Sequence, residues 1–214
     1  MTDDATTDGA VDPELRRAIA SLSPAGILIG HRLISQGDES ALLTDETKTI
    51  TVRTLKGRRA SGAARMVARR LLTELGREPC TLPKGPSGAP LWPEGIVGSL
   101  AHDDCVAVAA LGLRRNARAV GIDVEPAAML PSDILELVAT PLERLRIADD
   151  PYAGRLLFTA KEAVYKAVQP LDGIFLEFHD IEIDLARGKA VTRNAHAIDL
   201  RYCVSTRLFV LALV

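Results

Sequence analysis

The sequence predicts an α+β protein in which long helices pack against antiparallel strands. Two segments, residues 58–75 and 152–168, repeat apolar side chains with the 3.6-residue period of amphipathic helices. The end of the chain alternates apolar and polar side chains over residues 180–191, 198–204 and 207–214, as an antiparallel meander does. Helices and sheets of this kind bury their apolar faces against each other, which gives the α+β class.

The composition is that of a globular protein. The chain has 214 residues, of which 47% are hydrophobic and 25% charged, enough for one domain or two small ones. Lys and Arg number 26 against 28 Asp and Glu, so no overall field favours nucleic acid or an anionic membrane as partner. No apolar run approaches the ~20 residues of a membrane span. We therefore expect a cytoplasmic monomer.

The first elements follow from local patterns. Residues 1–13 are small and acidic, unlike a signal peptide, and we expect a disordered tail there. A short helix is expected over residues 14–21 and early strands over 25–33 and 41–44. In the helix predicted for residues 58–75, Gly76 can supply the left-handed cap. Its apolar stripe consists of Ala60, Ala64, Val67, Leu71 and Leu75.

The opposite side of this helix is basic. Arg58, Arg65 and Arg69 are spaced seven and four residues apart, so their side chains share one stripe. That stripe is either a solvated basic face or an anion-binding surface. Residues 76–98 follow, rich in proline and glycine, and they predict an ordered loop that contains the single tryptophan.

Two apolar strands are predicted next, at residues 105–111 and 119–125. They flank a short connection and are expected to form a hairpin. The connection between them carries Arg114, Arg115 and Arg118. It is either a solvated loop or a docking surface for an acidic partner. Cys80, Cys105 and Cys203 are odd in number and lack CxxC spacing, so we expect buried, reduced thiols.

Two acids share one face of the second of these strands. Side chains alternate along a strand, so Asp123 and Glu125 point away from the apolar face. Like charges this close repel each other unless a cation lies between them. The strand either has an ordinary polar side or holds a metal. Residues 180–185 carry acids at the same spacing with no need for a metal, so the pattern alone decides nothing.

A second acidic element lies on the helix predicted for residues 152–168. Glu162 and Lys166 are one turn apart, opposite its core stripe. They form either a surface ion pair or a functional pair. A further short helix is expected over residues 132–138. The core stripe of the longer helix consists of Leu157, Ala160, Val164 and Ala167.

Three motifs occur in order along the chain: KGPSGAPLWPEGIVGSLAHD, GIDVEP and FTAKEAVYKAVQPLDGIFLEF. Together they closely resemble the 4′-phosphopantetheinyl transferases, in particular the bacterial class of siderophore, nonribosomal peptide and polyketide synthesis. The resemblance extends from about residue 58 to the carboxyl terminus. It implies a pseudo-dimer of two similar α+β halves, here residues 14–103 and 104–214, with coenzyme and metal in the cleft between them.

The resemblance also implies the reaction. Members of the family move the 4′-phosphopantetheine arm of coenzyme A to a serine of an apo acyl or peptidyl carrier protein, with Mg²⁺, and release adenosine 3′,5′-bisphosphate. By similarity, Asp123, Glu125 and Glu162 would hold the Mg²⁺, which prefers oxygen ligands and substrate phosphates. Glu162 would also act as the base, and Lys166 would neutralise the leaving phosphate.

The coenzyme contacts implied by the resemblance lie mostly in the first half. His102 would meet the 3′-phosphate unless it is a structural histidine, and Lys84 would contact the same region. Arg65 and either Arg58 or Arg59 would bind phosphate from the basic helix, together with Lys166. Two positions depart from the family pattern. Ser87 stands where some relatives keep a lysine, and Ala101 lacks the usual hydroxyl donor.

Two other functions remain open at this stage. A Mg²⁺-dependent pyrophosphohydrolase of coenzyme A would use the same acids and pass the phosphate to water instead of to a carrier. A non-catalytic module that binds coenzyme A would keep the fold without turnover. Retention of all four of Asp123, Glu125, Glu162 and Lys166 argues against such a module.

Overall fold

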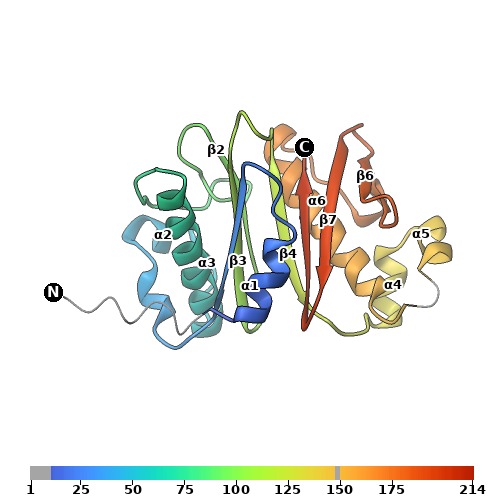
Figure 1. Ribbon diagram of the computed structural model, residues 1–214, viewed down its shortest axis with the longest axis horizontal. Coiled ribbons are helices and arrows are strands. Elements are labelled where there is room, and N and C mark those ends of the chain that lie inside the picture. The colour runs from blue at the N-terminus through green and yellow to red at the C-terminus, as the bar shows by residue number, and fades with distance from the viewer. Residues whose placement is uncertain (1–10, 148–149) are drawn as a thin grey trace.

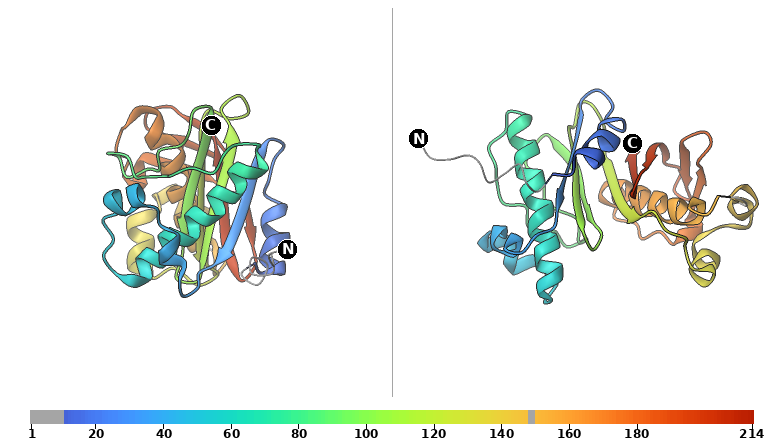
Figure 2. Two further views of the ribbon diagram at one scale, coloured as in Figure 1. Left: turned by 90° about the vertical axis from the view of Figure 1, so that its left-hand side faces the viewer. Right: turned by 60° about the horizontal axis from the view of Figure 1, so that its bottom comes forward.

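The computed structural model describes residues 11–147 and 150–214. It contains two antiparallel sheets, one with strand order β1-β3-β2 and the other with order β4-β8-β7-β6-β5 (Figure 1). The long helices α3 (Leu55–Glu74) and α6 (Ala153–Asp172) lie on opposite sides of the pair of sheets (Figure 2). This mixture of helices and antiparallel sheets confirms the predicted α+β class.

The first sheet consists of β1 (Ile27–Leu33), β2 (Ile96–His102) and β3 (Val106–Leu113), with β3 in the centre. The predicted apolar stripe of helix α3 is confirmed, and its members Ala64, Val67, Leu71 and Leu75 pack on this sheet. The helix begins earlier than the periodicity indicated, because Thr54 caps it by accepting a hydrogen bond from the Gly57 amide. Gly76, just beyond its end, has the expected left-handed φ of 70°.

The second sheet confirms the predicted meander, since β5, β6, β7 and β8 pair in sequence. In β5, Ile181 and Ile183 are buried as the alternation indicated. Strand β4 pairs with β8 at the far end of the chain. The bounds of the strands are β4 (Val120–Pro126), β5 (Ile181–Asp184), β6 (Lys189–Thr192), β7 (Ala197–Val204) and β8 (Arg207–Leu213).

Helix α6 lies unusually close to β4. A Cβ atom at Gly121 would lie 1.9 Å from the carbonyl oxygen of Ala163, so only glycine allows this approach. Val120, Ile122 and Val124 point the other way, into a core that the two sheets share. The predicted faces of the strand are therefore confirmed, and the acidic face of β4 is turned toward α6.

The predicted hairpin between residues 105–111 and 119–125 is wrong. Strand β3 pairs with β1 and β2, whereas β4 belongs to the second sheet. The cause is non-local: β4 finds its hydrogen-bonding partner in β8, which no local pattern reveals. Residues 114–119 therefore connect the two sheets.

The shorter helices complete the fold. The segment 41–44, expected as a strand, instead joins η2 (Asp38–Ala41) to α2 (Thr44–Thr49), because the Glu46 carboxylate accepts the Leu43 amide and starts a helix. The other helices, among them those predicted near residues 14–21 and 132–138, are α1 (Pro13–Ala20), α4 (Ser132–Val138), α5 (Pro141–Arg146) and η3 (Phe178–Asp180).

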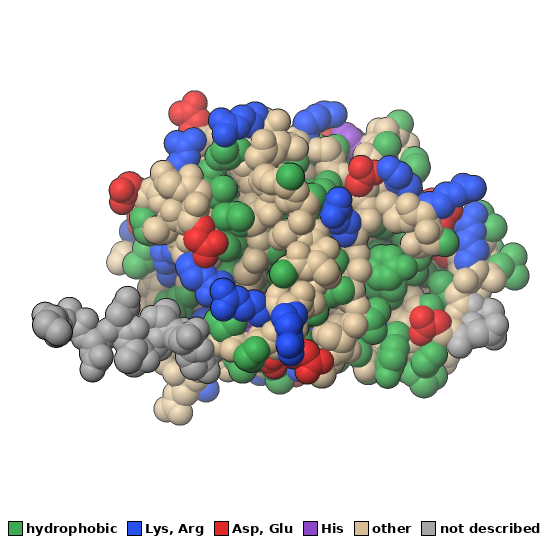
Figure 3. Space-filling view, in the orientation of Figure 1, with side chains coloured by type: hydrophobic (Ala, Val, Ile, Leu, Met, Phe, Trp, Pro, Cys, Tyr) green, Lys and Arg blue, Asp and Glu red, His purple; other side chains and the backbone are tan. Residues whose placement is uncertain are grey.

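The expected amino-terminal tail lies largely outside the described residues, which begin at Val11. Asp12 caps α1, accepting hydrogen bonds from the amides of Glu14 and Leu15. None of the helices in the described part of the chain is long and apolar enough to cross a membrane. On the face drawn in Figure 3, acidic and basic side chains are interspersed.

The three cysteines are free, as predicted, but none is fully buried. Cys80 and Cys203 are half-buried, and Cys105 is exposed. Cys105 lies in the turn between β2 and β3, one residue before the strand that was expected to contain it. The expectation of burial fails there because the apolar run starts only at Val106.

Candidate active site

A cavity of about 680 Å³ lies where α3, the loop before β2, and α6 meet. It thus joins the two layers of the fold, because β2 belongs to the first sheet, on which α3 packs, and α6 packs on β4 and β8 of the second. Five predicted site residues contribute to its lining, namely Arg65, Lys84, His102, Glu162 and Lys166. Side chains that are up to 101 positions apart, from Arg65 to Lys166, therefore face one space. Arg58, Asp123 and Glu125 are not among the lining residues.

Arg65 is the most buried of the cationic side chains that line the cavity. Its side chain is 3% exposed, with Nε donating to the Leu82 carbonyl at 3.0 Å and Nη1 to the Ser61 carbonyl at 3.2 Å. Its Nη2 atom is buried and has no hydrogen-bond partner among the described residues. Burial lowers the pKa of Arg65, and the nearby Glu46 opposes that shift. An unpaired donor on a buried guanidinium that contributes to the cavity lining suits an anionic ligand.

The other arginines of the helix behave differently. Arg69 donates to Glu46 at 2.8 Å and to the Ala41 carbonyl at 2.6 Å, so it holds the fold together. Arg59 pairs with Glu39 at 2.9 Å. A solvated basic stripe is therefore wrong for Arg65 and Arg69, which point inward. The contact of Arg58 with coenzyme A stays a prediction.

His102 ends β2 with an exposed side chain at the edge of the cavity. Desolvation by the surrounding atoms lowers the pKa of His102, and the positive charge of Lys166 lowers it further. Asp103 and Asp123 oppose both effects. An imidazole in this position can donate a hydrogen bond to a phosphate oxygen.

The two acids of β4 are each bound by a cation from α6. Asp123, 6% exposed, accepts a hydrogen bond from Lys166 Nζ at 2.7 Å. Glu125 accepts one from Arg155 Nη1 at 3.1 Å. Lys166 thus pairs with Asp123 and not with Glu162, so the alternative of a Glu162–Lys166 surface ion pair is wrong. Sequence reasoning missed Arg155, although it precedes Glu162 by seven residues and so shares its helix face.

Three carboxyl groups crowd this region. Burial raises the pKa of Asp123, of Glu125 and of Glu162. The charge of Asp123 raises the pKa of Glu125 and of Glu162 further, so both of these groups lie within range of the Asp123 charge. All-oxygen donors that repel each other suit a hard dication such as Mg²⁺, which is usually held by few carboxylates together with phosphate and water.

The carboxylates do not form a finished metal cage. No group of three or more acidic, histidine or cysteine side chains is arranged to hold a metal ion within residues 11–147 and 150–214. Because Lys166 and Arg155 hold the two acids of β4, a cation there competes with existing ion pairs. The all-oxygen chemistry of the donor set fits Mg²⁺, but the side chains would have to leave their present ion pairs to hold it.

Other lining residues were not anticipated for this role. Arg114 and Arg118, expected in a solvated loop or a docking surface, line the cavity. Trp92, Tyr165 and Leu171 form apolar walls beside them. Nothing in the sequence indicated that these two arginines line the cavity. They do so because residues 114–119 connect the two sheets and do not form a hairpin turn. Ser87 also lines the cavity, whereas Ala101 is buried in the shared core.

Comparison with known proteins agrees with this combination of fold and cavity. A model described as the 4′-phosphopantetheinyl transferase N-terminal domain matches residues 45–112. A model of the 4′-phosphopantetheinyl transferase superfamily matches residues 119–214. The two matches meet at the connection between the sheets. The fold and the cavity thus define a two-part transferase.

Several relatives are similar over most of the chain. The 4′-phosphopantetheinyl transferase Npt of Nocardia iowensis is 41% identical, with 82% of this chain and 81% of the relative aligned. PptT of Mycobacterium tuberculosis is 38% identical over 77% and 76%. Svp of Streptomyces mobaraensis is 36% identical over 77% and 70%. The chain therefore belongs to the 4′-phosphopantetheinyl transferase superfamily and is an enzyme of the transferase class.

Proposed function

We propose that this enzyme transfers the 4′-phosphopantetheine arm of coenzyme A to a serine of an apo acyl or peptidyl carrier protein, releasing adenosine 3′,5′-bisphosphate. The supporting observation is the cavity itself. It combines Arg65, Lys84 and His102 from one half with Glu162 and Lys166 from α6. Its volume of about 680 Å³ suits a cofactor-sized ligand. Cations suit the phosphates, and the acid beside them suits proton transfer.

The cavity has a cationic part and an apolar part, and coenzyme A has chemical groups that suit each of them. Phosphates would bind Arg65, Lys84 and His102, with the free Arg65 Nη2 as a directed donor. Arg58 is proposed as a further phosphate contact from α3. Arg114 and Arg118 add positive charge around the cavity, and the apolar walls would receive the uncharged parts of the coenzyme. Ala101 supplies no hydroxyl donor, so this phosphate site depends on its charged groups.

We propose Mg²⁺ as the metal, held by Asp123, Glu125 and Glu162. When bound, it would neutralise charge on the pyrophosphate of the coenzyme. The crowding of the three carboxyl groups supports this assignment, since each has a pKa raised by burial and two are raised further by Asp123. Lys166 would be released from Asp123 in that state and be free to meet a phosphate.

The proposed chemistry needs one proton acceptor and one cation. The serine oxygen of the carrier attacks the phosphorus that bears the pantetheine arm, and the bond to the bridging oxygen of the pyrophosphate breaks. Glu162 would accept the serine proton, for which its raised pKa makes it a better base than a solvated carboxylate. Lys166 would stabilise the negative charge that grows on the departing bisphosphate.

The connectivity supports a pseudo-dimer of two α+β halves. In the first half a strand, a long helix and two strands follow one another, and the sheet order is β1-β3-β2. The second half repeats the pattern with β4, α6, β7 and β8, in the order β4-β8-β7, with β5 and β6 added at the edge. We propose that the halves are 14–113 and 120–214, joined by the connection between the sheets.

The pathway is proposed from weaker relatives. Enterobactin synthase component D of Salmonella typhimurium is 34% identical over 112 residues, 49% of this chain. Enterobactin is a siderophore, which favours carrier proteins of siderophore, nonribosomal peptide or polyketide synthesis as partners. The experiment mixes enzyme, coenzyme A, Mg²⁺ and a panel of apo carriers, and weighs the carriers. A gain of one phosphopantetheine supports the proposal. Free phosphopantetheine as the only product would favour the pyrophosphohydrolase, and no product a binding module.

A further inference from the structure

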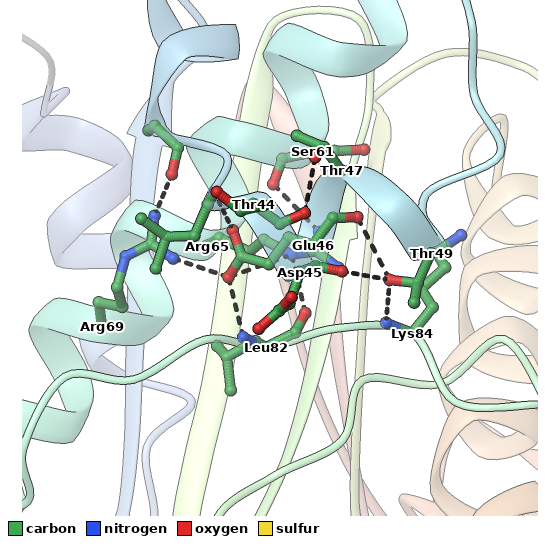
Figure 4. A network of polar contacts seen from close by, with 12 residues as sticks. Thr44, Asp45, Glu46, Thr47, Thr49, Ser61, Arg65, Arg69, Leu82 and Lys84 are labelled. Carbon is green, nitrogen blue, oxygen red and sulfur yellow. Dashed lines mark hydrogen bonds and ion pairs between the residues drawn. The ribbon is translucent and has the colours of Figure 1, made fainter.

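A buried carboxylate holds the polar wall of the cavity together (Figure 4). Glu46, on the six-residue helix α2, is 0% exposed. Its Oε2 accepts the Leu43 amide at 2.8 Å, and its Oε1 accepts both the Leu82 amide and Arg69 Nη1 at 2.8 Å. The same oxygen lies 3.7 Å from Arg65 Nε. One side chain thus joins α2, α3 and the segment that leads to Lys84.

A second residue of α2 holds the other end of that segment. Thr49 Oγ1 accepts a hydrogen bond from the Lys84 amide at 2.9 Å. Lys84 also forms a bridge with Pro90, which closes the loop that borders the cavity. The backbone from Leu82 to Lys84 is therefore bound to α2 at both of its ends, and the Lys84 side chain leaves from a fixed position.

Arg65 is held in the same way. Two of its donors are used by the Leu82 and Ser61 carbonyls, and Glu46 supplies the negative charge that a buried guanidinium needs. These contacts leave Nη2 buried and without a partner among the residues described, on a side chain that contributes to the cavity lining. An unpaired buried donor lowers the stability of the ligand-free protein. The network therefore holds in place a donor that a ligand could pair.

We propose that Glu46 is a positioning residue for coenzyme A, acting through Arg65 and through the backbone that carries Lys84, with Thr49 as its second anchor on α2. This inference rests on the proposed function, because it takes the cavity to be the coenzyme site. Glu46 itself is not a lining residue of the cavity. Its effect on binding is therefore indirect and must disappear when the residues that it positions are removed.

The second half contains a matched control. Glu143, on the six-residue helix α5, accepts the Thr140 amide at 2.8 Å and the Ile183 amide at 2.7 Å, and it pairs with Lys161 of α6 at 2.7 Å. Lys161 is 0% exposed, and its Nζ also donates hydrogen bonds to the Val138 and Phe178 carbonyls. The chemistry matches that around Glu46, but Lys161 does not line the cavity.

The test compares Glu46→Gln with Glu143→Gln. Coenzyme A binding is measured by calorimetry without carrier, and unfolding by urea. We expect both variants to be less stable, but only Glu46→Gln to raise the Kd for coenzyme A, by about ten-fold or more. In an Arg65→Met background the effect of Glu46→Gln on Kd should shrink. An unchanged Kd in Glu46→Gln, or an equal rise in Glu143→Gln, would overturn the positioning role.

Two further outcomes are separable. If Glu46→Gln does not fold, Thr49→Val tests the same scaffold, because it removes the acceptor of the Lys84 amide and otherwise only the hydroxyl's bonds to the Asp45 and Glu46 carbonyls of α2. We expect a several-fold rise in Kd with near-normal stability, and an unchanged Kd would refute the role of α2. If the unmodified enzyme fails to bind coenzyme A, the proposed function itself is wrong. Normal binding by the unmodified enzyme and by Glu46→Gln refutes only the positioning role.

Discussion

Lys166 Nζ donates a hydrogen bond to Asp123 Oδ1 at 2.7 Å, and this ion pair connects α6 to β4. Asp123 is almost fully buried, so Lys166 compensates a charge that burial disfavours. The close packing of Gly121 on Ala163 makes the contact possible. A cation that can exchange one negative partner for another lies beside the cavity in which we propose the reaction occurs.

Lys166→Ala is expected to lower the single-turnover rate of transfer about 10²–10³-fold, as removal of a donor to developing charge typically does. Coenzyme A affinity should change much less, because charge on the leaving phosphate grows mainly in the transition state. Rapid-quench transfer and calorimetry on the same variant check this, with Lys166→Arg as the charge-preserving control. A normal rate with reduced stability would leave the ion pair as a purely structural contact.

Asp123→Asn is expected to abolish Mg²⁺-stimulated transfer. Asparagine keeps the volume and can still accept the hydrogen bond from Lys166, so the fold should persist, but it removes the charge of a metal ligand. Transfer is titrated against Mg²⁺, with coenzyme A in excess. Asp184→Asn on β5 is the matched control, since that acid shares the strand pattern and lies away from the cavity. Near-normal transfer by Asp123→Asn at limiting Mg²⁺ would contradict the metal assignment.

His102→Ala is expected to weaken coenzyme A binding about ten-fold through loss of a hydrogen bond to a charged group. Dephospho-coenzyme A lacks the 3′-phosphate, so the penalty of the substitution should be much smaller with that ligand. Calorimetry with both ligands on the enzyme and the variant gives the comparison. A penalty of equal size for the two ligands would mean that His102 has a structural role instead.

His31 should make stability depend on pH. It is 2% exposed, its Nε2 accepts the Asp12 amide at 3.1 Å, and burial lowers its pKa below the ordinary 6.5. The unfolded chain therefore binds more protons just below pH 6.5, and the free energy of unfolding should fall as the pH drops through that window. Urea unfolding at several pH values should show a shallower slope for His31→Gln. An identical slope in the variant would rule out this contribution.

Cys105 is expected to be the first thiol to react with iodoacetamide at pH 8. It is exposed, whereas burial raises the pKa of Cys203 to about 11 and so leaves little thiolate at that pH. Mass spectrometry over time should show one fast modification that Cys105→Ser removes and Cys203→Ser retains. Fast labelling at Cys203 would show that its strand opens more readily than its burial indicates.

Local periodicity determined the regular elements of this protein. The stripe of α6, the meander from β5 to β8, and the two faces of β4 all depend on side chains within a few positions of each other, and all three were predicted. Motif spacing also indicated the family. This was possible because the residues proposed to bind the coenzyme and the metal lie in short continuous motifs. Such motifs can be identified in the sequence without knowing how the segments pack against each other.

Long-range packing decided the rest. Strand β4 does not form the expected hairpin because it pairs with β8, and the paired residues Ile122 and Leu211 are 89 positions apart. The burial of Glu46 and Arg65, the pairing of Lys166 with Asp123, and the place of Arg118 in the cavity depend on the same kind of contact. A local pattern states which side chains share a face, but only the tertiary structure brings two faces together and removes the water between their charges.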